Sequence, residues 1–360
     1  MKLEKALTLL EAVVPSRHPD PLLTYVGMEA KEDKLSLFGS DGTLDLELVL
    51  DYPVAGEGRY LVPRAPFFQL VKGMEDPFLA LEGRELKAAS GALKAEIRLA
   101  EWPERPRGKT PGEGGSWRSR EVEPAVLAEL FSKVLYAVSR EDYRGVFRGV
   151  QLEWREGGLR AVASDGYRLA MAWTGEGPLE KAVVLQASSA ALLVRVLRSL
   201  EAERALLSVE EAGKALALEV EEEGFSLKVG VSPMEGTYPD YERVVPKEFV
   251  LEAVLEAPSL VRALKRALVL AYRDNRRVDL LFEGDKVRLF TEGEYGKGEE
   301  ELPAKVTGTL PPVAFNGQYL LEALEAVEGE ARLRLSGQTT PALLEDLGAR
   351  YRAVVVPLRT

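Results

Sequence analysis

The stretch ASDGYRLA, residues 163–170, places an Asp-Gly pair between two runs of mainly apolar residues. Alternating apolar and polar residues around such a turn are typical of an antiparallel hairpin. The same stretch brings together Asp165, Tyr167 and Arg168, whose guanidinium looks exposed, as a small catalytic site would. The stretch alone leaves three functions open for this turn: chemistry, partner binding, or only the joining of two strands.

Related stretches occur twice more in the chain. LFGSDGTLDLEL (37–48) resembles AVASDGYRLAMA (161–172), and RLFTEGEYGKGEEE (288–301) takes the corresponding place a third time. An amphipathic helix is predicted ahead of each hairpin, over 3–14, 123–139 and 259–273. A short strand that enters a second helix is predicted behind each hairpin, over 60–74, 183–197 and 313–327. Offsets of about 120 to 130 residues indicate three tandem copies of one unit.

These patterns predict an α+β fold of three repeated domains, each with two helices and an antiparallel sheet. The predicted domains are 1–105, 121–236 and 237–360, with a linker at 106–120. The whole stretch 101–120 is rich in Pro, Gly and Arg, which is typical of a flexible connection. A shorter connector, 234–249, has prolines and tyrosines that are expected to fix its path.

The composition excludes several kinds of chemistry. The 360 residues include no cysteine, and the only histidine is His18, in a loop between prolines. Disulfides, thiolate metal sites and Ser-His-Asp chemistry therefore have almost no residues to use. GKT at 108–110 does not complete a phosphate-binding loop, because Pro103 stands where that motif needs glycine. The sequence predicts no catalytic residue, no metal site and no cofactor.

Location and source are also predicted from composition. No run of 18 apolar residues and no secretory signal is present, so we expect a cytoplasmic protein. Asparagine occurs only at Asn275 and Asn316, whereas Glu, Arg and Leu are abundant. Such a profile is reported for thermophilic proteins and favours a thermophilic source.

The charge is unevenly placed. A net charge of −11 means that the protein as a whole repels nucleic acid, so contact with a polyanion requires a local basic face. On the predicted helix 259–273, Leu260 and Leu264 lie on one side and Arg262 and Lys265 on the other. A solvated helix face alone explains such residues, but the same polarity on helices of successive repeats favours one shared surface.

The polyanion-facing residues predicted in this way are basic, and most lie on the helices. They are Lys5, Lys72, Lys133, Arg140, Arg195, Arg198, Arg262, Lys265, Arg266 and Arg273. The helix 313–327 is the exception, because Glu322 and Glu325 are among its expected exposed positions. No aromatic residues interleave with the basic ones, so sequence-independent, salt-sensitive contacts to a phosphate backbone are expected.

Four motifs in order resemble one known family. SDGYRLA (164–170), YPDYERVVP (238–246), FNGQYLLEAL (315–324) and YRAVVVPLRT (351–360) resemble the beta subunit of bacterial DNA polymerase III, the sliding clamp. The resemblance is weakest over 1–120: the family usually has a strand ahead of its first helix, and here Lys2 leads almost directly into the helix.

The resemblance implies a head-to-tail homodimeric ring of six similar domains that encircles duplex DNA and tethers the polymerase without catalysis. It implies further partners: the DNA polymerase III alpha subunit, the clamp loader and other proteins with a clamp-binding motif. It places Arg17 near DNA, and Val269 and Leu270 near the dimer interface.

The resemblance also implies a pocket for short partner peptides. The matching residues are Phe147, Ser164, Gly166, Tyr167, Arg168, Leu169, Pro239, Arg243, Val244, Asn316, Tyr319, Val354, Val355, Val356, Pro357 and Leu358. A buried final strand also explains VVVPL, and we expect burial for about half of its side chains. Asp165 and Gly166 recur as Asp41 and Gly42, which favours turn chemistry over catalysis.

Two other functions stay open at this point. The chain is alternatively a three-domain scaffold that binds peptides in the same groove without enclosing DNA. A hydrolase that depends on carboxylates is disfavoured, because no catalytic constellation accompanies the many acidic residues.

Overall fold

The SDG stretches form hairpin turns with the same hydrogen bonds in both copies. In the computed structural model, which describes residues 3–102, 115–348 and 350–359, Asp41 Oδ1 accepts hydrogen bonds from the backbone N–H groups of residues 43 and 44. Asp165 Oδ1 accepts them from residues 167 and 168 in the same way. Gly42 and Gly166 have φ of 91° and 88°, a conformation that favours glycine. The prediction of turn chemistry is confirmed.

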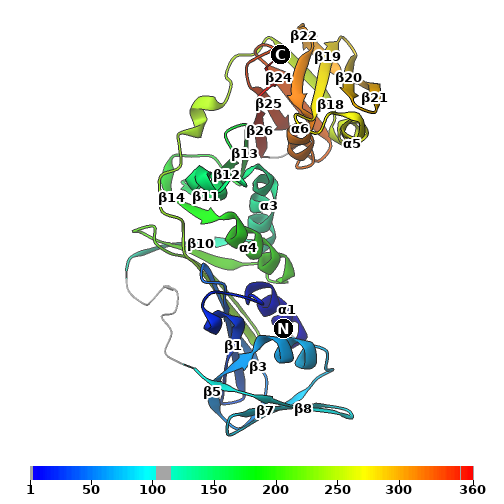
Figure 1. Cartoon of the computed structure of the whole chain (residues 1–360). Coiled ribbons are helices and arrows are strands. Elements are labelled where there is room, and N and C mark those ends of the chain that lie inside the picture. The colour runs from blue at the N-terminus through cyan, green and yellow to red at the C-terminus, as the bar shows by residue number, and fades with distance from the viewer. Residues whose placement is uncertain (1–2, 103–114, 349, 360) are drawn as a thin grey trace. The chain divides into compact units, whose positions relative to one another are not determined.

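The described chain divides into two compact units. One unit runs up to residue 128 and includes 188–233, and the other contains 129–187 and the residues from 234 onward (Figure 1). These units differ from the three predicted repeats, because each unit has a large sheet whose strands come from two repeats. The division into three domains stays a prediction.

The first unit contains a nine-stranded antiparallel sheet and a four-stranded sheet. The large sheet has the order β10-β15-β16-β17-β3-β2-β1-β5-β9. Its strands are β10 Trp117–Val122, β15 Ala205–Glu210, β16 Leu216–Glu222, β17 Phe225–Val231, β3 Leu44–Asp51, β2 Lys34–Ser40, β1 Tyr25–Lys31, β5 Gly58–Pro63 and β9 Ala100–Glu101. The small sheet consists of β4 Val54–Ala55, β6 Phe78–Glu82, β7 Glu85–Ser90 and β8 Leu93–Arg98, in that order.

Two longer helices accompany these sheets. In α1 (Leu3–Val13), the predicted apolar residues Leu3, Leu7 and Leu10 are buried, and the helix contacts β2 and β3. In α4 (Ala187–Ser199), Leu193, Val196 and Leu197 are buried, as the helical period predicts.

The second unit repeats this plan. Its nine-stranded sheet has the order β14-β11-β12-β13-β26-β25-β24-β18-β22, and its four-stranded sheet the order β21-β20-β19-β23. The strands of the large sheet are β14 Leu179–Gln186, β11 Gly149–Arg155, β12 Gly158–Ser164, β13 Arg168–Trp173, β26 Tyr351–Val355, β25 Ala342–Asp346, β24 Glu330–Leu335, β18 Leu251–Glu256 and β22 Lys305–Gly308. Those of the small sheet are β21 Gly296–Pro303, β20 Lys286–Gly293, β19 Arg277–Glu283 and β23 Val313–Asn316. The helices are α3 Pro124–Val134, whose first residues belong to the first unit, α5 Ala257–Leu270 and α6 Gly317–Leu324.

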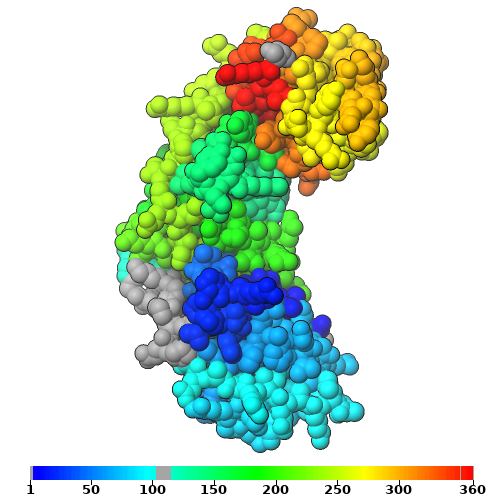
Figure 2. Space-filling view, in the orientation of Figure 1, coloured from blue at the N-terminus to red at the C-terminus, as the bar shows by residue number. Residues whose placement is uncertain are grey.

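The two large sheets contain the same junction. In the first unit β3 pairs with β17, and the register begins with Leu44 opposite Val231. In the second unit β13 pairs with β26, and the register begins with Arg168 opposite Val355. Both junctions therefore start three residues after the Asp of the SDG turn. In Figure 2 the red C-terminal strand lies against the green residues of the second repeat, as this pairing requires.

Three local predictions are wrong. The predicted linker 106–120 ends in strand β10, because residues 117–122 pair with β15; residues 103–114 lie outside the described residues. The helix predicted over 123–139 ends at Val134 and gives way to a 3-10 turn. After Pro63 the helix is short: α2 (Arg64–Pro66) passes into a π-helical turn, Phe67–Val71, which ends before Lys72.

Within the described part of the chain, no helix is long and apolar enough to cross a membrane. The same residues contain no group of three or more His, Asp or Glu side chains arranged to hold a metal ion.

Candidate partner-binding site

The pairing of β13 with β26 divides the predicted pocket residues between two faces of one sheet. Leu169 lies opposite Val354, and Arg168 lies opposite Val355. Because side chains alternate along a strand, the two pairs point to opposite faces. Leu169 and Val354 face the connector 234–249, whereas Arg168 faces the side that carries α6.

The connector face has an apolar cluster. Its buried members are Val162, Leu169, Met171, Val184, Tyr238, Tyr241, Leu343 and Val354. Phe147 packs at its margin, with its ring edge-on to Tyr238 at 5.6 Å between centroids. Tyr238 and Tyr241 anchor the connector in this cluster, so the prediction that its tyrosines fix its path is confirmed. Phe147, Leu169 and Val354 are brought together here.

Exposed residues surround this cluster. Pro239, Arg243 and Val244 lie on the connector, and Val244 is 53% exposed. Gly166 is exposed in the turn, and Tyr167 beside it is 51% exposed. Exposed connector and turn residues next to a buried apolar cluster are suited to contact a short peptide at the surface.

The last strand supplies another part of the rim. Val354, Val355 and Pro357 are buried, whereas Val356 is 37% exposed and Leu358 is half-buried, as expected for about half of VVVPL. The backbone N–H of Val356 donates to the carbonyl of Tyr167 at 3.0 Å, and that of Leu358 donates to the carbonyl of Ala314 at 2.8 Å. The chain end is thus held beside the SDG turn.

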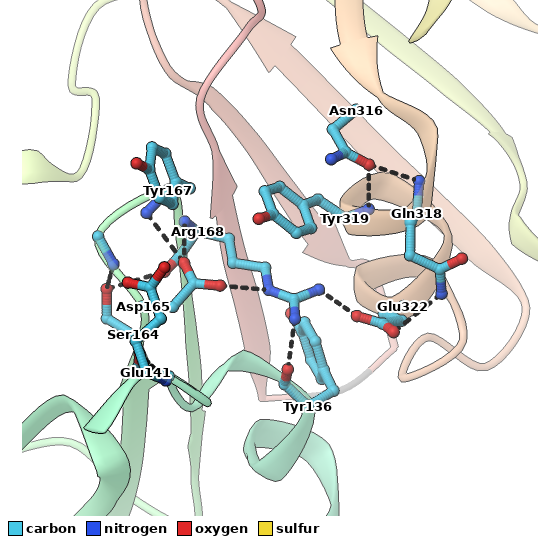
Figure 3. Close-up of polar contacts among 12 residues, drawn as sticks. Tyr136, Glu141, Ser164, Asp165, Tyr167, Arg168, Asn316, Gln318, Tyr319 and Glu322 are labelled. Carbon is cyan, nitrogen blue, oxygen red and sulfur yellow. Dashed lines mark hydrogen bonds and ion pairs between the residues drawn. The ribbon is translucent and has the colours of Figure 1, made fainter. Parts of the chain in front are cut away.

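Arg168 is not exposed, contrary to the expectation. It is 7% exposed, and each of its guanidinium nitrogens has a partner (Figure 3). Nε donates to Asp165 at 3.1 Å, Nη2 donates to the carbonyl of Tyr136 at 2.7 Å, and Nη1 pairs with Glu322. A buried charge requires such partners, because burial of an unpaired ion costs on the order of several kcal/mol. Arg168 therefore binds three elements of the protein together, and these bonds use three of its five N–H donors.

Two tyrosines, Tyr167 and Tyr319, pack against each other next to Arg168. Tyr167 and Tyr319 stack with 6.4 Å between their ring centroids, and the Arg168 guanidinium lies 4.4 Å from the Tyr319 ring.

Asn316 caps α6: its Oδ1 accepts from the backbone N–H groups of Gln318 at 3.0 Å and of Tyr319 at 3.4 Å. Ser164 Oγ accepts from the N–H of Gly166 at 3.2 Å and holds the turn.

A cavity of about 290 Å³ lies beside this tyrosine pair. It is lined by Val138, Ser139, Arg140, Glu141, Asp165, Tyr167, Arg168, Gln318, Tyr319 and Glu322. Glu322 was predicted to be exposed, but its side chain is only 21% exposed because it pairs with Arg168.

The predicted DNA-facing residues differ in their surroundings. Arg17, Arg140, Arg195, Arg198, Arg262, Lys265, Arg266 and Arg273 are exposed, although Arg140 and Arg273 lie beyond the helix ends. The three lysines Lys5, Lys72 and Lys133 are more covered, with side chains 35%, 28% and 12% exposed. Each of the three pairs with a glutamate: Glu201, Glu11 and Glu129. Lys72 and Lys133 are thus less available to a polyanion than the helix wheels predicted.

The two residues predicted near a dimer interface lie at the end of α5. Val269 is 75% exposed and Leu270 is half-buried. Together with Tyr272 and Tyr295, which are 52% and 75% exposed, they line a recess of about 660 Å³. We call Val269, Tyr272 and Tyr295 the α5 patch; exposed apolar and aromatic side chains gathered in this way mark contact surfaces.

Comparisons with known proteins agree on one family. The model of the DNA polymerase III beta subunit central domain matches residues 121–240, and that of its C-terminal domain matches residues 242–359. Beta sliding clamps from Synechococcus elongatus and Caulobacter vibrioides are 27% and 28% identical, over 99% of this chain and 97% of each relative.

Solved structures agree in fold. The DNA polymerase III beta subunit of Thermotoga maritima has a TM-score of 0.88 at 26% identity, over 99% of this chain and 97% of that one. The beta subunit from the DNA polymerase of Streptococcus pyogenes has the same TM-score at 19% identity, which shows the shared fold. The matched domain models and the relatives that align along almost the whole chain lead to one conclusion: this chain belongs to the DNA polymerase III beta subunits, the beta sliding clamps.

Proposed function

We propose that the protein works as a homodimeric ring that encloses duplex DNA and tethers its polymerase by topology, without catalysis. The observation that carries the proposal is the repeated sheet junction. In each large sheet, the last strand of one repeat pairs with the strand that follows the hairpin turn of the repeat before it. The chain makes this junction twice, as β17 with β3 and β26 with β13.

A third junction of this kind needs a second copy. Its strands would be β8, the last strand of the small sheet in the first repeat, and β21, which follows the hairpin turn of the third repeat. Each forms the end of its four-stranded sheet, and a sheet end offers unpaired backbone groups. Because β8 and β21 are different edges, pairing between copies is head-to-tail, and two such contacts close a ring.

Charge and apolar surface favour this pairing. Lys94 and Arg98 are exposed on β8, and Glu299 and Glu301 are exposed on β21. The α5 patch lies beside the same edge, since α5 packs against β21. A junction of β8 with β21 thus combines opposite charges with burial of Val269, which is the chemistry of a stable interface.

Contacts to DNA are proposed for the exposed cations. Arg195 and Arg198 on α4, and Arg262, Lys265 and Arg266 on α5, lie on the exposed sides of helices in a chain of net charge −11. Lys265 and Arg266 pair with Glu325 and Glu300, so DNA phosphates have to compete with these carboxylates. Binding of this kind is independent of base sequence and weakens with salt.

The groove on the connector face is proposed to take short peptides from several partners. By family membership these are the DNA polymerase III alpha subunit, the clamp loader and other proteins with a clamp-binding motif, acting in the cytoplasm of a thermophilic source. The apolar base of Leu169 and Val354 and the exposed Val244 and Val356 suit an extended apolar segment.

The ring requires a dimer, so the mass in solution is the first test. At micromolar concentration, sedimentation equilibrium is expected to give about 79 kDa, twice the 39.6 kDa of one chain. A monomer under these conditions would count against the ring and favour the alternative, a peptide-binding scaffold that never encloses DNA.

A further inference from the structure

We propose that Glu153 is a positioning residue of the peptide groove, which acts through the buried Tyr241 to hold the connector and its exposed Pro239, Arg243 and Val244 against the sheet. The inference rests on the proposed peptide groove. It concerns a buried polar network that lies beneath the groove and includes none of the residues that the family resemblance assigns to it.

Glu153 is 1% exposed on β11, among apolar neighbours. Its Oε1 accepts hydrogen bonds from the hydroxyl of Tyr241 at 2.8 Å and from Nε2 of Gln151 at 2.7 Å. Its Oε2 accepts from Nε of Arg155 at 2.7 Å. A carboxylate buried this deeply is tolerated because each of its oxygens has a close donor.

Tyr241 is the only one of these partners that belongs to the connector. Its hydroxyl donates to Glu153 and accepts from Arg160 at 3.2 Å and from Arg155 at 3.3 Å. Arg160 also pairs with Glu242, the next residue of the connector, at 2.5 Å. The sheet therefore holds two consecutive connector residues by charge-assisted contacts.

The hydrogen bond from Tyr241 to Glu153 is expected to persist across neutral pH. Burial and the nearby Glu153 carboxylate raise the pKa of Tyr241 to about 12. The phenol therefore stays protonated, and able to donate to Glu153, at every pH at which the protein is expected to work.

Tyr241 also begins the turn that forms the groove wall. The 3-10 turn Tyr241–Val244 carries Arg243 and Val244, and the exposed Pro239 lies just ahead of it. The ring of Tyr241 is fixed in the apolar cluster, and its hydroxyl, together with the Arg160–Glu242 pair, ties the turn to the sheet. Without that anchor the turn Tyr241–Val244 samples more conformations. The free energy needed to order the turn when a peptide binds then lowers the peptide affinity.

Two variants remove the anchor in different ways. Tyr241→Phe keeps the ring and deletes the hydroxyl, and Glu153→Gln keeps the shape but leaves Arg155 without its carboxylate. The matched control is Tyr351→Phe. Tyr351 is 1% exposed in the same sheet; its hydroxyl donates to the carbonyl of Ala323 at 2.9 Å and shares a hydrogen bond of 2.7 Å with the hydroxyl of Tyr136, and neither partner belongs to the connector.

The experiment measures binding of a fluorescent peptide from the DNA polymerase III alpha subunit to the full-length protein, together with amide hydrogen exchange of the free protein. We expect Tyr241→Phe and Glu153→Gln to weaken binding roughly tenfold, the loss of about one charge-assisted hydrogen bond. The double variant is expected to bind no worse than the weaker single one, because both changes remove the same anchor. Amides of residues 240–245 should exchange faster in both variants and at the normal rate in Tyr351→Phe.

Unchanged affinity and exchange in Tyr241→Phe, or an equal loss of affinity in Tyr351→Phe, would overturn the proposal while the groove assignment stands. If the unaltered protein does not bind the peptide, the groove assignment falls and this proposal falls with it.

Discussion

Replacing Val269 with aspartate is expected to convert the proposed dimer into monomers at micromolar concentration. Val269 is 75% exposed in the free chain, on the last turn of α5 and beside the β21 edge. In the proposed junction this side chain is buried against the partner, where an unpaired carboxylate costs on the order of several kcal/mol. A ring has two identical junctions, so dimerisation weakens by roughly a thousandfold or more.

Analytical ultracentrifugation of the variant measures this directly, and Val250→Asp is the matched control. Val250 is also exposed, at 55%, but lies just before β18 and away from the α5 patch. The control should remain a dimer with an unchanged dissociation constant. A dimeric Val269→Asp protein would show that the α5 patch is not part of the interface.

Removing residues 356–360 is expected to abolish binding of a polymerase-derived peptide and to leave the dimer intact. The deletion takes away the exposed Val356 of the groove rim and the buried Pro357. It also removes the backbone hydrogen bonds from Val356 to Tyr167 and from Leu358 to Ala314, which hold the chain end beside the SDG turn. Loss of both contact surface and preorganisation is expected to reduce affinity by at least about a hundredfold.

The control for this deletion is a shorter one. Removal of only residues 359 and 360 keeps Val356 and Leu358 in place and should preserve peptide affinity. Calorimetry with the same peptide compares the two proteins, and ultracentrifugation confirms that both are dimers. Retained affinity after the longer deletion would mean that the groove lies elsewhere.

The local features of this fold were predictable because short stretches determine them. The hairpin turns depend on Asp41 and Asp165, whose carboxylates bind the backbone two and three residues ahead. The apolar sides of α1, α4 and α5 follow the helical period, and Leu7, Leu193 and Leu264 on these sides are buried.

Long-range contacts were beyond the sequence patterns. A helix wheel placed Glu322 in solvent because it considers one helix alone, whereas the partner of Glu322 is Arg168, 154 positions away. The same limit explains Lys72, which pairs with Glu11 of another element. Strand junctions are of this kind too, since no local pattern shows that β13 adjoins β26.

The groove was partly predictable. Tyr238 and Tyr241 were expected to fix the connector, and both are buried in the cluster. Glu153 gave no such signal, because an acidic residue in a strand of alternating apolar and polar residues is expected to face solvent. Only the fold shows that this side of β11 is covered by the connector.

The proposed topological hold on DNA is tested most directly by comparing retention on circular and on linear DNA. After loading onto closed circular duplex DNA, the protein should remain bound through gel filtration at a salt concentration that abolishes ordinary electrostatic binding. Cutting the same DNA once should release it, because a ring that holds DNA by topology slides off an open end. Equal retention on circular and linear DNA, or equal loss from both, would contradict the account of the protein as a sliding clamp.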